Sequence, residues 1–459
     1  MKDNRILKKL KAVLDQGLFG FSFESILLTA LLGFRVLWNY WLILFMEENG
    51  RRIHFYDRFA KIVFLLMLMV SVLRFVIYLL DSPRKKPDPC YLLILAYAFL
   101  GFLSSLLNYG ADVYYERRYF MALIELFMVT VVMYRTAPTL SEKRFQNLLE
   151  IIGWFLFVIV LVLNILSLVL YFGGADASLN LFGRVYQRKD LFDFDNHNGI
   201  ETATRYYGLY GNPVVMGNRT AIACLLALHL TFRKRMKGFL SCILYLSSLV
   251  LVILSDSRAS LINLLVMAWF MLAEILQKRK NLPASKAYGY PALAGLAGIA
   301  GGVILKWNSI MKILSRIKAD PVTALNAIGS GRVNLFLNCM KLAGQKPLYG
   351  HGWLSMVSKY LNNAHNIYAN AAAWTGYTGL ILLIVFTAAV TARLFRNKTR
   401  IHANPFLLCL ILCVFIQSVL DKAILGEVAN AETYLFWLCL GYFCFGVRMD
   451  HSEPELRKA

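Results

Sequence analysis

Long apolar segments recur along the whole 459-residue chain and constrain its fold more than any other feature. A helix of roughly 20 apolar residues spans the hydrocarbon core of a bilayer, and 58% of this sequence is hydrophobic. About twelve segments meet that requirement, near residues 23–46, 60–80, 90–108, 119–135, 147–173, 212–231, 238–255, 259–277, 289–306, 366–392, 405–421 and 431–447. The sequence therefore predicts an all-α integral membrane protein with about twelve transmembrane helices.

Short basic segments between the apolar ones predict how the helices are oriented. If the N-terminus lies in the cytoplasm, the inner segments carry clusters of Lys and Arg, at residues 2–11, 84–86, 135–144, 233–237, 278–286, 393–400 and 448–458. Cytoplasmic loops of membrane proteins are enriched in these residues, so we expect both termini to be cytoplasmic. The formal net charge of +22 then reflects this topology and contact with anionic membrane lipid. Basic residues scattered over short loops do not indicate nucleic-acid binding.

The expected organisation is one helical membrane domain with two large outer loops. A cytoplasmic basic leader, a polytopic membrane domain and a cytoplasmic tail cover residues 1–22, 23–449 and 450–459. The outer loops lie at about 174–211 and 307–365. The leader is not expected to be a cleaved signal peptide, because no small-residue cleavage site follows it.

No cofactor, metal site or disulfide framework is expected. Six of the eight cysteines lie inside predicted spans, which is unlike a disulfide scaffold or a zinc motif. The segment Asp193-Phe-Asp195-Asn-His197 has an alternating pattern found in metal and nucleotide-sugar sites, but so short a pattern favours a plain surface turn. The sequence contains no P-loop, no Gly-rich dinucleotide motif and no Gly-x-Ser-x-Gly elbow.

His365 stands where a long polar segment meets the tenth predicted span. The unperturbed pKa of histidine suits proton transfer near neutral pH, and ionisable groups at a membrane helix are often functional. The structural alternative is an interfacial histidine that only caps the helix. The functional interpretation gains weight because the predicted topology places several arginines on the same membrane face.

Four arginines lie on or near this outer face, at Arg205, Arg219, Arg258 and Arg332. Structural alternatives exist for each: solvated loop residues at Arg205 and Arg332, a snorkelling side chain at Arg219, and an ion pair with Asp256 at Arg258. A guanidinium also offers planar, bidentate donors to a phosphate. Together with His365, the set suits a phosphorylated leaving group that arginines neutralise while a histidine removes a proton from the nucleophile.

Four short motifs occur in a fixed order on this face. They are Arg205-x-x-Gly208 followed by Asn212-Pro213, then Ser255-x-Ser257-Arg258, then Gly331-Arg332 followed by Pro347-Leu-x-Gly350-x-Gly352, and finally His365-Asn366-x-Tyr368 followed by Gly376-x-x-Gly379. In this order, over about residues 150–390, the chain resembles the O-antigen ligase and polymerase superfamily of bacterial cell-envelope glycosyltransferases.

The resemblance implies an activity and a set of site residues. The activity is a metal-independent, inverting transfer of glycan from an undecaprenyl-diphosphate donor at the outer face of the bacterial cytoplasmic membrane, without a cofactor. His365 would be the general base. The diphosphate would be bound by Arg258 with Arg205 or Arg219, Arg332 is a further candidate, and Asn212, Asn366 and Tyr368 would support the site.

Three functions follow, of which the leading one is a polysaccharide polymerase. It would join lipid-linked repeat units into O-antigen, capsule or exopolysaccharide, with a glycan acceptor and a chain-length regulator as candidate partners. The second is a ligase that transfers finished glycan to lipid A core or another acceptor. The third is a flippase or transporter of lipid-linked oligosaccharide, but transporters place their ionisable groups near the bilayer midplane, whereas these lie toward the outer face.

Overall fold

The computed structural model describes a set of segments that covers most of the second half of the chain. They are residues 17–18, 21–22, 89–108, 142–181, 184–197, 200–210, 213–255, 257–280, 282–283, 286–290, 293, 332–353, 364–396, 403–420 and 431–445. The predicted spans near 23–46, 60–80, 119–135 and 289–306 lie wholly or mostly outside these residues. The predicted total of twelve spans, the basic leader and the tail therefore remain predictions.

The described part is mostly helical, as the sequence predicts. Its helices are α4 (Pro89–Leu107), α7 (Glu142–Phe172), α8 (Pro213–Phe232), α9 (Gly238–Leu254), α10 (Arg258–Lys280), α14 (Arg332–Gln345), α16 (Ile367–Arg396), α18 (Pro405–Leu420) and α19 (Ala431–Phe445). Within them, three segments are long and apolar enough to cross a membrane, namely Phe145–Phe172, Ala259–Lys278 and Ile367–Leu394. Leu92–Leu107, Gly238–Leu254 and Pro405–Val419 are shorter apolar helices.

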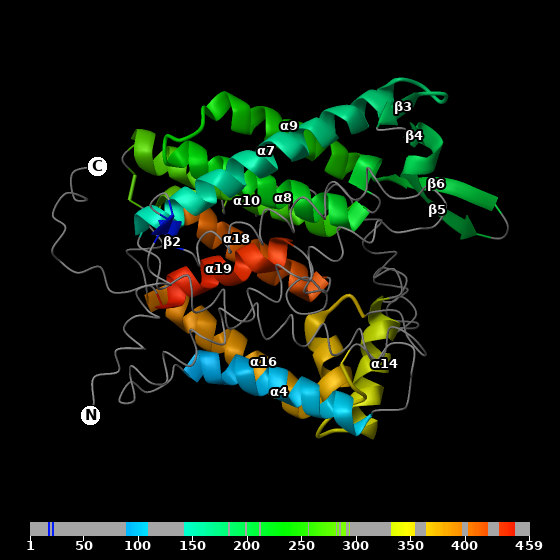
Figure 1. Ribbon diagram of the computed structural model, residues 1–459, viewed down its shortest axis with the longest axis vertical. Coiled ribbons are helices and arrows are strands. Elements are labelled where there is room, and N and C mark those ends of the chain that lie inside the picture. The colour runs from blue at the N-terminus through cyan, green and yellow to red at the C-terminus, as the bar shows by residue number, and fades with distance from the viewer. Residues whose placement is uncertain are drawn as a thin grey trace.

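The helices form two layers with a pair between them. Figure 1 shows α7 to α10 in one layer, α4 and α16 in another, and α18 and α19 between the two. Helix α8 lies at the centre and packs against α7, α9, α10, α18 and α19. Every residue from 219 to 230 is buried, including the polar residues Arg219, Thr220 and His229.

The segment predicted as the first outer loop folds into two antiparallel hairpins. Strands β3 (Ser178–Leu181) and β4 (Arg184–Gln187) form one, and β5 (Phe192–His197) and β6 (Ile200–Tyr206) form the other. The 3₁₀ helices η3 (Arg188–Leu191) and η4 (Gly208–Tyr210) follow the first and second hairpin, respectively. Two further strands of two residues each, β1 (Gly17–Leu18) and β2 (Phe21–Ser22), pair near the N-terminus. The described part is thus mostly helical with two hairpins in this segment. At the start of β5, the sequence Phe192-Asp-Phe-Asp195 alternates apolar and polar residues with the two-residue period of a strand.

Both predicted outer loops reach the same end of the helices. In Figure 1 the hairpins and α14, which belongs to the second loop, lie at the right-hand ends of the two helical layers. The residues that the sequence singles out are therefore carried to one end of the bundle.

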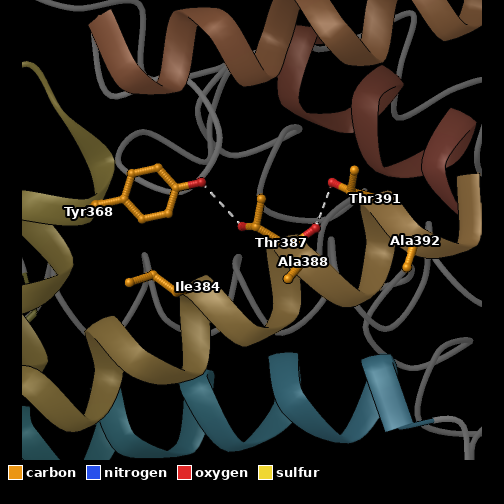
Figure 2. Close-up of a pocket in the computed structure, with 6 residues that line it drawn as sticks. All are labelled: Tyr368, Ile384, Thr387, Ala388, Thr391 and Ala392. Carbon is orange, nitrogen blue, oxygen red and sulfur yellow. Dashed lines mark hydrogen bonds between the residues drawn. The ribbon is translucent and has the colours of Figure 1, made fainter.

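Helix α16 is broken, whereas the sequence predicted one continuous span there. Gly376 has a φ of 73° and separates a first section, 367–375, from a second, 377–396. In a straight helix Tyr368 and Thr387 would lie about 28 Å apart along the axis. Instead the Tyr368 hydroxyl donates to Thr387 Oγ1 at 3.2 Å, as Figure 2 shows. The first section of α16 therefore folds back along the second.

The loop that carries Pro347, Gly350 and Gly352 holds this break together. The Tyr377 amide donates to the Pro347 carbonyl at 2.7 Å, and the Gly352 amide donates to the Trp374 carbonyl at 3.1 Å. These bonds satisfy backbone groups that the break removes from the helix, as burial in a membrane bundle requires. A Cβ on Gly350 would lie 2.5 Å from the Gly376 nitrogen, so the loop can approach the break only with glycine there.

We predict that Gly376→Ala destabilises the protein. Alanine disfavours a φ of 73°, which costs more than about 1 kcal/mol, and its Cβ would lie 2.4 Å from the Pro347 oxygen. The thermal unfolding midpoint in detergent should therefore fall. Gly344→Ala is the control, because Gly344 lies within α14 and its nearest neighbour would be the Tyr377 hydroxyl at 3.7 Å. Equal midpoints for the two variants would contradict the account of the break.

Candidate functional site

His365 lies directly before α16 in a strained backbone conformation. Its φ is 51°, a value that is uncommon for residues other than glycine and persists only where the surroundings impose it. The Ala364 amide donates to Asn370 Oδ1 at 3.2 Å, and Asn366 Oδ1 accepts from the amides of residues 368 and 369 at 2.9 and 3.1 Å. The cap of α16 is therefore Asn366, which removes the helix-capping alternative for His365.

Asn366 also ties the start of α16 to the end of α18. Its Nδ2 donates to the Val419 carbonyl at 3.0 Å. Val419 lies in the last four residues of α18, whose carbonyls have no partner within the helix. One side chain thus satisfies backbone groups at two helix ends, which fixes His365 relative to α18.

Gln417, two residues earlier on α18, connects this end to the arginine-bearing helix α8. Its Nε2 donates to Asn218 Oδ1, and Asn218 directly precedes Arg219. Gln417 is 3% exposed and Arg219 is 7% exposed. Our sequence interpretation missed Gln417, although a lone amide in an otherwise apolar helix is a signal that could have found it.

Gly217, near the start of α8, packs against the segment that follows the Ser-x-Ser-Arg turn at the start of α10. A Cβ on Gly217 would lie 1.6 Å from Ser260 Oγ, and Ser260 Oγ lies 2.8 Å from Ser257 Oγ. Arg258, the first residue of α10, is therefore brought to the helix that carries Arg219. The Arg258 side chain and Asp256 lie outside the described residues, so their predicted alternative ion pair remains a prediction.

Arg205 on β6 contacts the same turn. Its Nε donates to the Ser255 carbonyl at 2.9 Å, just beyond the last residue of α9. The structure therefore brings Arg205, Arg219 and the backbone of Arg258 together through direct contacts of the segments that carry them.

The Arg-x-x-Gly turn is fixed to the end of α7. Gly208 has a φ of 55°, and a Cβ there would lie 2.4 Å from Ser167 Oγ. Ser167 Oγ accepts from the Leu209 amide at 3.0 Å, and the Ser167 carbonyl accepts from the Tyr206 hydroxyl at 2.6 Å. The glycine thus allows the turn to pack closely, which positions Arg205.

Arg332 is positioned through α16 instead. It begins α14, which packs on the second section of α16, where the Tyr377 hydroxyl donates to the Met340 carbonyl at 3.2 Å. His351 Nε2 donates to the Leu342 carbonyl at 3.0 Å. Burial lowers the pKa of His351, which favours its neutral form, and the bond to Leu342 connects the loop of His351 to α14.

For the remaining predicted residues, the structure describes either the backbone alone or nothing. Asn212 lies outside the described residues. Asp193, Asp195 and His197 lie on β5, but their side chains are also outside the description. Within the described segments, no group of three or more His, Cys, Asp or Glu side chains could hold a metal ion.

An apolar groove begins at Tyr368, in the first section of α16, and follows the second section. It has a volume of about 730 Å³ and is lined by Tyr368, Ile384, Thr387, Ala388, Thr391 and Ala392, as Figure 2 shows. The threonine hydroxyls donate to helix carbonyls one turn earlier, at 2.9 Å from Thr387 and 2.8 Å from Thr391. Because these hydroxyls are satisfied, the groove is suited to a hydrocarbon chain.

The comparison with protein families covers several of these residues. The family model described as O-antigen ligase matches residues 242–384, from α9 to the second section of α16, a stretch that contains Arg258, Arg332 and His365. No curated protein matches the chain. The resemblance to the O-antigen ligase and polymerase superfamily is thus confirmed by a family match over residues 242–384.

Proposed function

We propose that this protein is a glycosyltransferase that joins undecaprenyl-diphosphate-linked repeat units into a polysaccharide. The observation that carries the proposal is the chain of contacts from His365 to Arg219. It runs from Asn366 to Val419 on α18, then from Gln417 to Asn218 on α8. These contacts hold the segments of His365 and Arg219 at the same end of the bundle, which supports a base and a cation acting together there.

The arginines would stabilise the departing diphosphate. Arg219 is almost fully buried, so its charge is screened less than it would be in water. Arg205 and Arg258 approach the same region from β6 and α10. Guanidinium groups donate two parallel hydrogen bonds to phosphate oxygens, and donors fixed in advance stabilise charge that develops in the transition state.

His365 would act as the general base. As the acceptor oxygen bonds to the anomeric carbon, the bond from that carbon to the diphosphate oxygen breaks, and the hydroxyl proton passes to the imidazole. A single displacement of this kind inverts the anomeric configuration. The arginines supply the countercharge for the diphosphate, so the step as written uses no metal ion.

The membrane location of the site follows from the donor and the topology. The apolar groove beside Tyr368 supports a donor with a long hydrocarbon chain, because it begins three residues after His365 in the sequence and runs along the second section of α16. Basic segments such as 233–237 lie at the other end of α8 from Arg219. By the positive-inside rule, the site would face the outside of the bacterial cytoplasmic membrane.

Ligation is the second candidate, because the matching family model is described as O-antigen ligase. The donor chemistry would be the same, and the acceptor would be lipid A core or another molecule instead of a growing chain. A chain-length regulator would be a partner of the polymerase only. The two functions are separated by their product: a polymerase makes a ladder of chain lengths on the lipid carrier, whereas a ligase moves glycan from that carrier to a new acceptor.

We predict that His365→Ala abolishes glycan transfer. Loss of a general base typically lowers the rate by about 10²–10⁴-fold. Single-repeat lipid-linked units should therefore accumulate when the variant is expressed in a strain that lacks the native enzyme. The measurement is glycan laddering at matched protein levels. His351→Gln is the control, because glutamine retains a donor for the Leu342 carbonyl. A normal ladder from His365→Ala would remove the base assignment, and equal loss from both variants would indicate a folding defect.

We also predict that Arg258→Lys is nearly as damaging as Arg258→Ala. Lysine keeps the charge but loses the planar fork, and removal of a transition-state donor typically lowers kcat by about 10²-fold or more. The measurement is turnover of a lipid-diphosphate-linked donor by purified protein. Arg235→Lys is the control, because Arg235 is 62% exposed at the opposite end of the bundle. Full turnover by Arg258→Ala would exclude a diphosphate-binding role for Arg258.

A further inference from the structure

Helix α18 ends in two buried polar residues that are satisfied in different ways. The Ser418 hydroxyl donates to the Val414 carbonyl of its own helix at 2.7 Å. The Gln417 amide instead reaches across to Asn218 Oδ1 on α8. Both side chains are at most 3% exposed, but only Gln417 couples two helices.

This amide pair sits between the two halves of the proposed site. On one side, Asn218 is adjacent to Arg219, so fixing Asn218 also fixes the rotation of α8 that directs Arg219. On the other side, Val419 lies two residues after Gln417, and its carbonyl accepts from Asn366, next to His365. The C-terminal end of α18 thus connects the segment that carries Arg219 to the segment that carries His365.

Apolar packing alone defines the relative position of two helices poorly. Contacts between apolar side chains are not directional, and helices in a membrane bundle gain little hydrophobic energy from association. A hydrogen bond between side-chain amides defines both the rotation and the axial position of the two helices. Reacting groups need this precision, because a misplacement of about 1 Å can lower a rate by about 10²-fold.

We infer that Gln417 is a positioning residue that, through its bond to Asn218, holds the arginine-bearing end of α8 in register with the His365 segment. This inference rests on the proposed function and deepens it. Gln417 itself does not touch the reacting atoms, so its loss should lower kcat while the KM for the donor stays nearly constant.

The test uses an exchange of the two side chains in the full-length purified protein. Gln417→Asn shortens one side of the pair by a methylene, and Asn218→Gln lengthens the other. Each single variant should lower kcat by roughly tenfold to a hundredfold. The exchange variant, which carries both substitutions, keeps the combined length and should recover kcat to within about threefold of the unmodified protein. Ser418→Ala is the matched control and should keep its activity.

The outcomes separate this inference from the proposed function. Full activity of Gln417→Ala beside an inactive His365→Ala would overturn the inference alone, as would an exchange variant that folds but recovers nothing. Absence of glycan transfer by the unmodified protein would overturn the proposed function. If the single variants fold poorly, recovery of both folding and kcat in the exchange variant supports the pairing. A fall in the thermal midpoint of Gln417→Ala with unchanged kcat would show that the bond is only structural.

Discussion

The hydrogen bonds of Asn366 are the interaction on which the rest of the site depends. A helix end in a membrane leaves backbone donors or acceptors without partners, and water is scarce there. Asn366 satisfies donors at the start of α16 and the Val419 carbonyl at the end of α18. Because His365 precedes it directly, the need to satisfy two helix ends also fixes the proposed base.

The break in α16 also leaves backbone groups that need hydrogen-bond partners. A membrane helix that stops at Gly376 exposes carbonyls, and the loop of Pro347 to Gly352 and α4 both supply donors for them. Ser104 Oγ on α4 donates to the Trp374 carbonyl at 2.7 Å, which connects α4 directly to the break. The glycines at 350 and 376 are therefore required by backbone approach, and their spacing can be explained without assigning them a role in chemistry.

Much of this architecture is predictable from the sequence, because its signals are local. Apolar length predicted eight of the described helices, and the order of motifs indicated the family whose model matches residues 242–384. The hairpins of residues 178–206 were missed because polar strands were read as loop, and the break at Gly376 was missed because hydropathy does not detect a change in φ. The lone amide of Gln417 in an apolar helix was a local signal, but its pairing with Asn218, 199 residues away in the sequence, is a contact that no local pattern shows.

The most direct test of the central claim is a structure of the protein in a lipid nanodisc with a polyprenyl-diphosphate-linked glycan bound. The account predicts that the diphosphate lies between Arg219 and Arg258 and that the hydrocarbon chain follows the groove beside Tyr368. The His365 ring should face the side from which an acceptor hydroxyl could approach to about 3 Å. A diphosphate at the opposite end of the helices, near Arg235, or one too far from His365 for a bridging acceptor, would contradict the account.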